Sequence, residues 1–275
     1  MTTQFSFDSD ILPFLQEDLG SGDITAAIIP ATQHAKAELL TREWMVLCGR
    51  EWFDAVFRHL DAAIVIEWHV LEGEHVAPDT LLCTLHGNAR GILSAERTAL
   101  NLLQTLSATA TLSREYANAV AGTRCRVLDT RKTLPGLRLA QKYAVRCGGC
   151  FNHRIGLFDG GLIKENHIFA AGAIANAVRI AREQSDAPVE VEVESLRELE
   201  EALNAKPDRI MLDNFSLEDL RLAVQRVAGE IELEASGNID LTTIHVVAQT
   251  GVDYISIGAL TKNIRAIDLS LRIQL

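Results

Sequence analysis

The sequence predicts an α/β protein in which a mixed α/β segment precedes a β/α barrel, and three observations support this prediction. After Gly122, short apolar runs alternate with segments of helical periodicity, which is typical of parallel strands joined by helices. No GxGxxG pattern follows the first of these strands. Polar residues follow nearly every predicted strand, at the end where barrel active sites are built. We therefore favour a barrel over a doubly wound sheet.

The first hundred residues predict a small antiparallel sheet with one short helix. Residues 35–49 are strand-like and residues 50–60 have helical periodicity. Residues 62–87 alternate between apolar and polar positions and contain turn-forming Gly and Pro, which indicates short strands joined by turns.

A long helix is expected from about Ser94 to Val120, with Ser94 as its N-cap and Gly122 as its stop signal. Arg97 would then lie in the first turn, where a cation opposes the helix dipole by roughly 0.3 to 1 kcal/mol. This placement suggests a use for the Arg97 side chain elsewhere, although the neighbouring Glu96 would offset its charge equally well.

Predicted strands and helices alternate through the rest of the chain. The strands are expected within residues 125–130, 160–167, 188–195, 208–215, 231–236 and 253–259. The helices are expected within residues 174–184, 196–205, 217–229 and 241–251. Strands joined by such helices must run parallel, so the polar residues at their carboxyl ends converge on one mouth.

Composition excludes several classes of protein. A chain of 275 residues with 48% hydrophobic content can bury a large core, and its net charge of -11 argues against nucleic-acid binding. The first twenty residues lack a signal peptide pattern and no apolar run reaches membrane-spanning length, so we expect a cytoplasmic protein without a membrane partner. Five scattered cysteines indicate a reducing compartment. The CxxC pair Cys147 and Cys150 lacks a second pair or a nearby His-x-x-His, which disfavours zinc.

One short segment carries a net positive charge, although the whole chain is negatively charged. Between residues 124 and 154 a single acid, Asp129, accompanies eight basic residues. The basic residues are Arg124, Arg126, Arg131, Lys132, Arg138, Lys142, Arg146 and Arg154. An exposed helix face normally mixes both signs of charge, so this segment indicates a site for a small anionic ligand, with a solvated basic face as the alternative.

The strand within residues 188–195 predicts carboxylates that face the barrel interior. Side chains alternate along a strand, so the glutamates at 190, 192 and 194 share the side opposite the valines. Buried carboxylates need a cation, which predicts pairing with Arg or Lys or binding of Mg²⁺; an edge strand with a solvated glutamate face is the alternative. Asp213, which closes the next strand, is a candidate second ligand for Mg²⁺.

Several smaller signals suit anionic ligands. Gly237 and Gly258 each follow a strand where a helix is expected to begin, which favours a phosphate cradle of backbone N–H groups, with ordinary turn glycines as the alternative. Lys164 is either a Schiff-base nucleophile or a fixed cation. His153, beside Arg154, is a candidate acid, base or hydrogen-bond donor.

Nine motifs together resemble one family. They are "EDLGSGDIT" (17–25), "ERTALN" (96–101), "DTRKTLPGLR" (129–138), "CGGCFNHRIGL" (147–157), "LIKENHI" (162–168), "VEVEVES" (189–195), "IMLDNF" (210–215), "SGNI" (236–239) and "ISIGALT" (255–261). In this order, over nearly the whole chain, they closely resemble the quinolinate phosphoribosyltransferases, also called nicotinate-nucleotide pyrophosphorylases (carboxylating). The resemblance implies a small N-terminal α/β domain (1–107) with an antiparallel sheet and an open, irregular α/β barrel (108–265) of about seven strands. We also allow for the C-terminal tail, about 266–275, packing on the first domain.

The resemblance also implies an activity in NAD biosynthesis. Quinolinate and 5-phosphoribosyl-1-pyrophosphate would yield nicotinate mononucleotide, pyrophosphate and CO₂, with Mg²⁺ required, in a homodimer or a higher oligomer. Two polyanionic substrates would account for the dense positive charge. The alternatives are a phosphoribosyltransferase acting on nicotinate or serving molybdenum transport, a Schiff-base aldolase, and a noncatalytic phosphosugar sensor.

The resemblance assigns roles to particular residues. Those expected to bind quinolinate are Arg131, Arg154 and Lys164, with Thr130 and His153 nearby and Arg97 from the neighbouring subunit. Those expected to hold the 5-phosphate are Ser236, Gly237, Asn238, Gly258 and Ala259. Lys132 and Lys164 would border the pyrophosphate, and Glu192 and Asp213 would bind Mg²⁺ and the ribose side. The residues expected to act in catalysis are Lys132, Lys164, Glu192 and Asp213.

Two positions depart from a simple transfer of the family pattern. Strand alternation alone would place Glu194 nearer the mouth, whereas the family's spacing to Asp213 selects Glu192. Cys150 stands where glycine is expected, so the turn before Phe151 either tolerates a side chain or is not strained.

Overall fold

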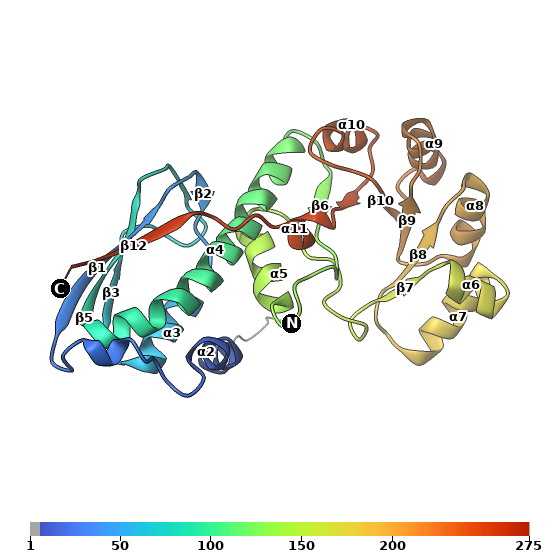
Figure 1. Cartoon of the computed structure of the whole chain (residues 1–275). Helices are drawn as coiled ribbons and strands as arrows, with labels where there is room; N and C mark the ends of the chain where they lie inside the picture. Colours follow the sequence, from blue (N-terminus) through green and yellow to red (C-terminus); the bar gives the residue numbers. More distant parts are fainter. Residues whose placement is uncertain (1–5, 275) are drawn as a thin grey trace. The chain divides into compact units, whose positions relative to one another are not determined.

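The computed structural model describes residues 6–274 and divides them into two compact units. The first unit combines the described residues up to Leu112 with Leu139–Gly148 and with the residues from Ile264 onward. The second unit combines Ser113–Arg138 with Gly149–Asn263. Each unit has a sheet of its own (Figure 1). The boundary between residues 107 and 108 remains a proposal from the sequence.

The first unit contains the antiparallel sheet that the sequence predicts. Its strands, in the order β12-β1-β5-β3, are β12 (Leu269–Gln274), β1 (His34–Thr41), β5 (Leu81–Asn88) and β3 (Val65–Trp68). β1 pairs with β12 from Lys36 opposite Gln274 to Thr41 opposite Leu269, so the C-terminal strand belongs to this sheet.

The strand expected over residues 35–49 is interrupted. The Thr41 hydroxyl donates to the Glu43 carbonyl (2.8 Å) and closes a local turn after β1. The chain then forms the short strand β2 (Met45–Val46), which pairs with β4 (His75–Val76) as a separate two-stranded sheet.

The first unit contains several helices besides its sheet. They are α1 (Phe7–Asp10), α2 (Leu12–Leu19), the 3₁₀ helix η1 (Ala26–Ile28), α3 (Arg50–Leu60), the part of α4 (Ala89–Ala119) up to Leu112, and most of α5 (Arg138–Cys147). α3 confirms the helix expected at residues 50–60, and it buries Trp52, Phe53 and Val56. α5 was not predicted from the sequence, because basic residues are interspersed with the apolar residues that it buries, such as Ala140 and Ala144.

The start of the long helix was predicted wrongly. α4 begins at Ala89 rather than Ser94, because the Asn88 side chain already accepts a hydrogen bond from the Arg90 N–H (3.0 Å) directly after β5. Ser94 instead donates its hydroxyl to Asp23 (2.7 Å). Arg97 therefore lies beyond the first turn, and the argument from an opposing helix dipole does not apply to it.

The second unit is a parallel sheet with helices around the outside of its strands (Figure 1). Its strands, in the order β6-β11-β10-β9-β8-β7, are β6 (Arg126–Leu128), β11 (Tyr254–Ser256), β10 (Glu232–Ser236), β9 (Arg209–Asp213), β8 (Val189–Val193) and β7 (Gly161–Ile163). Its helices are α6 (Glu165–Ala171), α7 (Ile174–Gln184), α8 (Leu196–Ala205), α9 (Leu217–Val227), α10 (Ile244–Ala248) and α11 (Ala259–Lys262), together with the end of α4.

This sheet has the open α/β barrel character that the sequence predicts. Among residues 6–274 no pairing joins β7 to β6, so the sheet does not close on itself. Six strands are present where about seven were expected, and a parallel bridge between Leu128 and Phe151 adds one further strand position beside β6. All neighbouring strands run parallel, as expected.

The turn before α3 generates a first prediction. Gly49 has a φ of 109°, and a Cβ there would lie 2.9 Å from the Leu106 side chain. We expect Gly49→Ala to lower the free energy of unfolding by about 1 to 3 kcal/mol, because strain and overpacking add. The control is Gly229→Ala, with a φ of 83° and no atom within 4 Å, which adds backbone strain alone. Urea denaturation measures both; equal losses would contradict the overpacking.

Candidate active site

A cavity of about 360 Å³ opens at the carboxyl ends of the strands of the second unit. Cationic, carboxylate, hydroxyl and apolar side chains all contribute to its wall. The lining residues are Thr130, Arg131, Lys132, His153, Arg154, Leu162, Lys164, Glu192, Met211, Asp213, Glu234, Ser236 and Ser256. Catalytic sites of β/α barrels lie at this end of the strands.

Two arginines give the cavity its positive character. Burial, followed by the like charge of Arg131, holds the pKa of Arg154 below its usual range. The Arg131 Nε is buried and has no hydrogen-bond partner within the described part of the chain. Arg154 is fixed by donating from Nη1 to the Gly160 carbonyl (2.8 Å). Half-buried guanidinium groups of like charge favour an anionic ligand that bridges them.

Arg138 holds the loop that carries Arg131. Its guanidinium donates to the Thr133 hydroxyl (3.1 Å), the Arg131 carbonyl (3.4 Å) and the Ile155 carbonyl (3.3 Å). From the sequence, Arg138 was expected only as one of the basic residues, without a role of its own. Its bonds fix the loop beside the segment that bears Arg154.

Asp129 anchors that second segment from behind. The carboxylate is fully buried and accepts hydrogen bonds from the Asn152 side chain (2.7 Å) and the His153 N–H (2.9 Å). The only acid of the basic segment is therefore a positioning group, and its charge is shielded from solvent.

His153 connects the cavity to two buried carboxylates. The Arg154 N–H donates to Nδ1 (2.8 Å), so the ring proton lies on Nε2, which faces Glu190 (2.8 Å) and Glu234 (3.5 Å). Burial raises the pKa of Glu190 to about 7, and burial with the neighbouring Glu190 charge raises the pKa of Glu234 to about 7. Arg209 adds a contact to Glu234 (3.3 Å).

The predicted inward direction of the glutamates is confirmed for Glu190 and Glu192 and is wrong for Glu194. β8 lies between β7 and β9, so it is not an edge strand. Glu190 and Glu192 are 6% and 9% exposed and pair with His153 and Lys164. Glu194 follows the end of β8, is exposed and does not line the cavity, so Glu192 is the glutamate of this strand that reaches it.

Lys164 forms an ion pair with Glu192, and Asp213 lines the same cavity. The Asn214 amide donates to the Asp213 carboxylate (2.7 Å) and orients it. The ion pair fixes the Lys164 Nζ beside a carboxylate, so the geometry favours Lys164 as a fixed cation over a Schiff-base nucleophile.

The turn after β10 differs from the expected helix start. α10 begins only at Ile244, because Asp240 accepts hydrogen bonds from the N–H groups of Thr242 and Thr243 and forms a separate turn first. Gly237 has a φ of 96°, and a Cβ there would lie 2.2 Å from the Asn214 side chain. The residue must therefore be glycine for this close approach of two loops.

The turn after β11 agrees with expectation, because α11 begins with Gly258 as its N-cap. A Cβ on Gly258 would lie 3.2 Å from the Lys132 side chain, so the glycine leaves room for that lysine. The Thr261 hydroxyl also donates to the Lys132 carbonyl (2.8 Å). This turn therefore positions Lys132 at the cavity.

Of the residues predicted from the sequence, the cavity gathers Thr130, Arg131, Lys132, His153, Arg154, Lys164, Glu192, Asp213 and Ser236. Those that do not line it are Gly237, Asn238, Gly258 and Ala259, and Arg97, which is exposed on α4 in the first unit. The lining residues that the sequence analysis missed are Leu162, Met211, Glu234 and Ser256. Strand periodicity could have predicted them, because each of these four residues lies two positions before a predicted site residue and so faces the same side of its strand.

Cys150 fits its position without strain. Its φ is not positive, while the adjacent Gly149 adopts a φ of 98° and makes the turn. The Cys150 sulfur donates to the Ser113 carbonyl (3.1 Å), and burial raises the pKa of this thiol to about 12. A side chain is therefore tolerated there.

The fold and the cavity define an α/β-barrel protein with a cationic cavity at the carboxyl ends of its strands. Two family models match consecutive parts of the chain. "Quinolinate phosphoribosyl transferase, N-terminal domain" matches residues 23–107, and the corresponding C-terminal domain matches residues 109–272. The chain belongs to the quinolinate phosphoribosyltransferase family.

Individual relatives agree with this assignment. The chain is 39% identical to the probable nicotinate-nucleotide pyrophosphorylase [carboxylating] of Bacillus subtilis over 95% of this chain and 91% of that protein. It is 42% identical to the nicotinate-nucleotide pyrophosphorylase [carboxylating] of Mycobacterium leprae, over 94% and 93% of the two chains. The solved nicotinate-nucleotide pyrophosphorylase of Francisella tularensis is 49% identical, has a TM-score of 0.95 and shares 98% coverage of both chains.

Within residues 6–274, none of the helices combines the length and apolar character needed to span a bilayer.

The buried carboxylates generate a prediction about pH. The pKa of Glu190 and of Glu234 is about 7 in the folded state, whereas the pKa of a glutamate in the unfolded chain is about 4.3. The free energy of unfolding should therefore fall as pH rises from about 4.3 to about 7 and then level off, with each linked proton adding at most about 1.4 kcal/mol per pH unit.

Glu234→Gln removes one of the two sites and should flatten that slope, as measured by urea denaturation at several pH values. Glu183→Gln is the control, because Glu183 is exposed and pairs with Arg179 at the surface. An unchanged slope in Glu234→Gln would contradict the linkage.

Proposed function

We propose that the chain transfers the phosphoribosyl group of 5-phosphoribosyl-1-pyrophosphate to quinolinate, releasing nicotinate mononucleotide, pyrophosphate and CO₂ for NAD biosynthesis. The observation that supports this most directly is the presence of Arg131, Arg154 and Lys164 in one cavity. Three cations suit a small ring with two adjacent carboxylates. The names of the relatives, carboxylating pyrophosphorylases, describe the same reaction.

The main contribution of the quinolinate contacts would be to orient the ring for reaction. The forked guanidinium groups of Arg131 and Arg154 would each grip a carboxylate and turn the ring nitrogen toward the ribose C1 carbon. Leu162 and Met211, two apolar residues of the cavity wall, would contact the ring face. His153 would act as a positioning residue, since it holds the backbone N–H of Arg154.

The phosphoribosyl substrate would lie on the other side of the cavity. Lys132 and Lys164 would stabilise the departing pyrophosphate as positive charge develops on the sugar. Ser236 is a candidate donor to the 5-phosphate because it lines the cavity. The backbone N–H groups of the turns after it, at 237–238 and 258–259, complete the proposed phosphate cradle.

Mg²⁺ fits the carboxylates on this side. Glu192 and Asp213 line one cavity and offer only oxygen donors, which a hard cation prefers. We propose that these two side chains hold the ion, which when bound would offset the negative charge of the pyrophosphate.

Loss of CO₂ would follow ribosylation. The ring nitrogen becomes cationic once it bonds to ribose, and the ring then accepts the electron pair of the breaking bond to the adjacent carboxylate. That ring carbon afterwards takes a proton. The electron demand of the ring itself drives the step, so no separate acid or base is assigned.

The direct experiment is incubation of the purified protein with quinolinate, 5-phosphoribosyl-1-pyrophosphate and Mg²⁺, with CO₂ release and nicotinate mononucleotide as readouts. Both products should form in equal amounts. If nicotinate mononucleotide forms from nicotinate and not from quinolinate, nicotinate is the substrate. If the protein binds the substrates tightly and forms no product, it is a noncatalytic sensor.

Arg154→Ala should lower kcat/KM for quinolinate by at least about 100-fold, because it removes a charge-assisted contact and leaves the ligand carboxylate without its partner. The control is Arg179→Ala, which removes an exposed arginine paired with Glu183 outside the cavity. Steady-state kinetics with quinolinate varied measures both. Wild-type kinetics in Arg154→Ala would remove quinolinate from the proposal.

We further propose a cytoplasmic homodimer in which Arg97 completes the site of the neighbouring subunit, a role that its exposure on α4 supports. Arg97→Ala and Arg154→Ala should each be inactive alone. Unfolded, mixed and refolded together, they should recover about a quarter of wild-type activity, since half of the dimers then contain one intact site. No recovery from two inactive variants would mean that Arg97 acts within its own subunit. An Arg97→Ala protein that is active alone would mean that Arg97 has no role in the site.

A further inference from the structure

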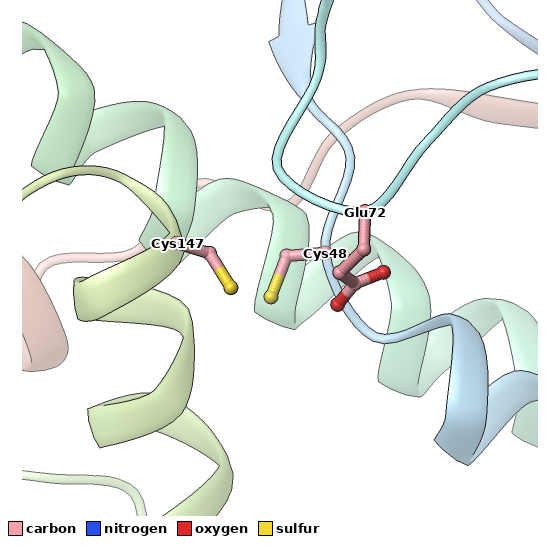
Figure 2. A group of neighbouring side chains, drawn as sticks. All are labelled: Cys48, Glu72 and Cys147. Carbon is pink, nitrogen blue, oxygen red and sulfur yellow. The ribbon is translucent and has the colours of Figure 1, made fainter.

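Three metal-ligating side chains meet in the first unit, apart from the residues of the proposed catalytic cavity. Cys48, Glu72 and Cys147 place one sulfur or oxygen atom each within 4.8 Å of the others. Cys48 precedes α3, Glu72 lies between β3 and β4, and Cys147 ends α5. Figure 2 shows the two sulfurs pointing toward each other, with the Glu72 carboxylate beside Cys48.

Neighbouring groups hold the carboxylate in place. Glu72 accepts hydrogen bonds from the Gly49 N–H (2.8 Å) and the Arg50 N–H (3.3 Å) at the start of α3. These bonds orient the carboxylate toward the sulfurs, as outer partners do for metal ligands. They also explain Glu72 as a cap of α3, which is the competing interpretation of this residue.

The Cys147 sulfur has supporting contacts of its own. Hydrogen bonds from the Cys48 thiol and then from the Tyr143 hydroxyl lower the pKa of Cys147, while burial opposes them. Arg146 adds a smaller favourable charge. These contacts place the Cys147 sulfur beside the Cys48 sulfur, and the thiolate is the form of cysteine that binds metals.

Cys48 has the opposite tendency. It is fully buried, and burial, the Cys147 sulfur and the Glu72 charge all raise its pKa. A divalent cation would reverse the balance, because it attracts all three groups and displaces the thiol proton.

The donor set selects the kind of cation. Two thiolates and one carboxylate suit a borderline-soft ion that is four-coordinate, and they do not suit Mg²⁺ or Ca²⁺, which take oxygen ligands. In a tetrahedral zinc site with Zn–S of about 2.3 Å, two sulfurs lie about 3.8 Å apart, which is compatible with the observed grouping within 4.8 Å.

We propose that Cys48, Glu72 and Cys147 bind one Zn²⁺-type cation, with water as the fourth ligand. The ion ties the segment before α3 to the end of α5 within the first unit. The site is distinct from the Mg²⁺ site assigned to Glu192 and Asp213, which offers no sulfur.

Co²⁺ titration tests the proposal, because sulfur ligands give Co²⁺ an intense charge-transfer absorption in the near ultraviolet and tetrahedral geometry gives strong visible bands. The full-length protein, stripped of metal by a chelator and kept reduced, is titrated in excess Mg²⁺ so that oxygen sites are occupied. We expect both absorptions to saturate at one Co²⁺ per chain and to disappear when Zn²⁺ is added.

Cys147→Ser and Cys48→Ser should each reduce the sulfur charge-transfer absorption and weaken Zn²⁺ binding at least tenfold in competition with a chromogenic chelator. Glu72→Gln should weaken binding while keeping the sulfur absorption. Cys83→Ser is the matched control, since Cys83 is an equally buried thiol of the first unit outside the cluster. Far-ultraviolet circular dichroism of every variant confirms that it is folded.

Absence of the sulfur absorption in the wild-type protein would overturn the proposal and leave Glu72 as a cap of α3 alone. An absorption that Cys83→Ser lowers as much as Cys147→Ser does would also overturn it. Neither outcome bears on phosphoribosyl transfer, which is assayed separately by CO₂ release.

Discussion

The confinement of like charges in one cavity is the constraint on which this protein depends. Arg131 and Arg154 oppose each other, and burial adds to the cost of their charge. Two neighbouring groups hold them there: the buried Asp129 binds the segment that bears Arg154, and Arg138 holds the loop that bears Arg131. The cavity therefore remains cationic before a substrate arrives, and an anionic ligand removes the repulsion that the fold maintains.

The alternation of side chains along the parallel strands determines which residues line the cavity. Residues two apart on a strand face the same side, so a strand that ends at the mouth also supplies a residue to the wall below it. Three such pairs are Leu162 and Lys164, Met211 and Asp213, and Glu234 and Ser236. Each pair combines a polar group at the rim with a different kind of group beneath it, which gives a small cavity several chemical surfaces.

The two candidate metal sites follow from different structural causes. Glu192 and Asp213 come together because neighbouring parallel strands end at one edge, and both offer oxygen. Cys48 and Cys147 come together because a loop and the end of α5, distant in sequence, pack within one unit. The first arrangement follows from the fold class, whereas the second needs the specific packing of the first unit.

The sequence by itself determined the strands of the barrel, the helices at 50–60, 174–184 and 196–205, and the family, because periodicity and ordered motifs are local properties. Only the tertiary structure decided which distant groups meet. It joined Ser94 to Asp23, and it set His153 against two buried glutamates. Such contacts depend on packing between segments far apart in the chain, and no local pattern records which partner a side chain will find.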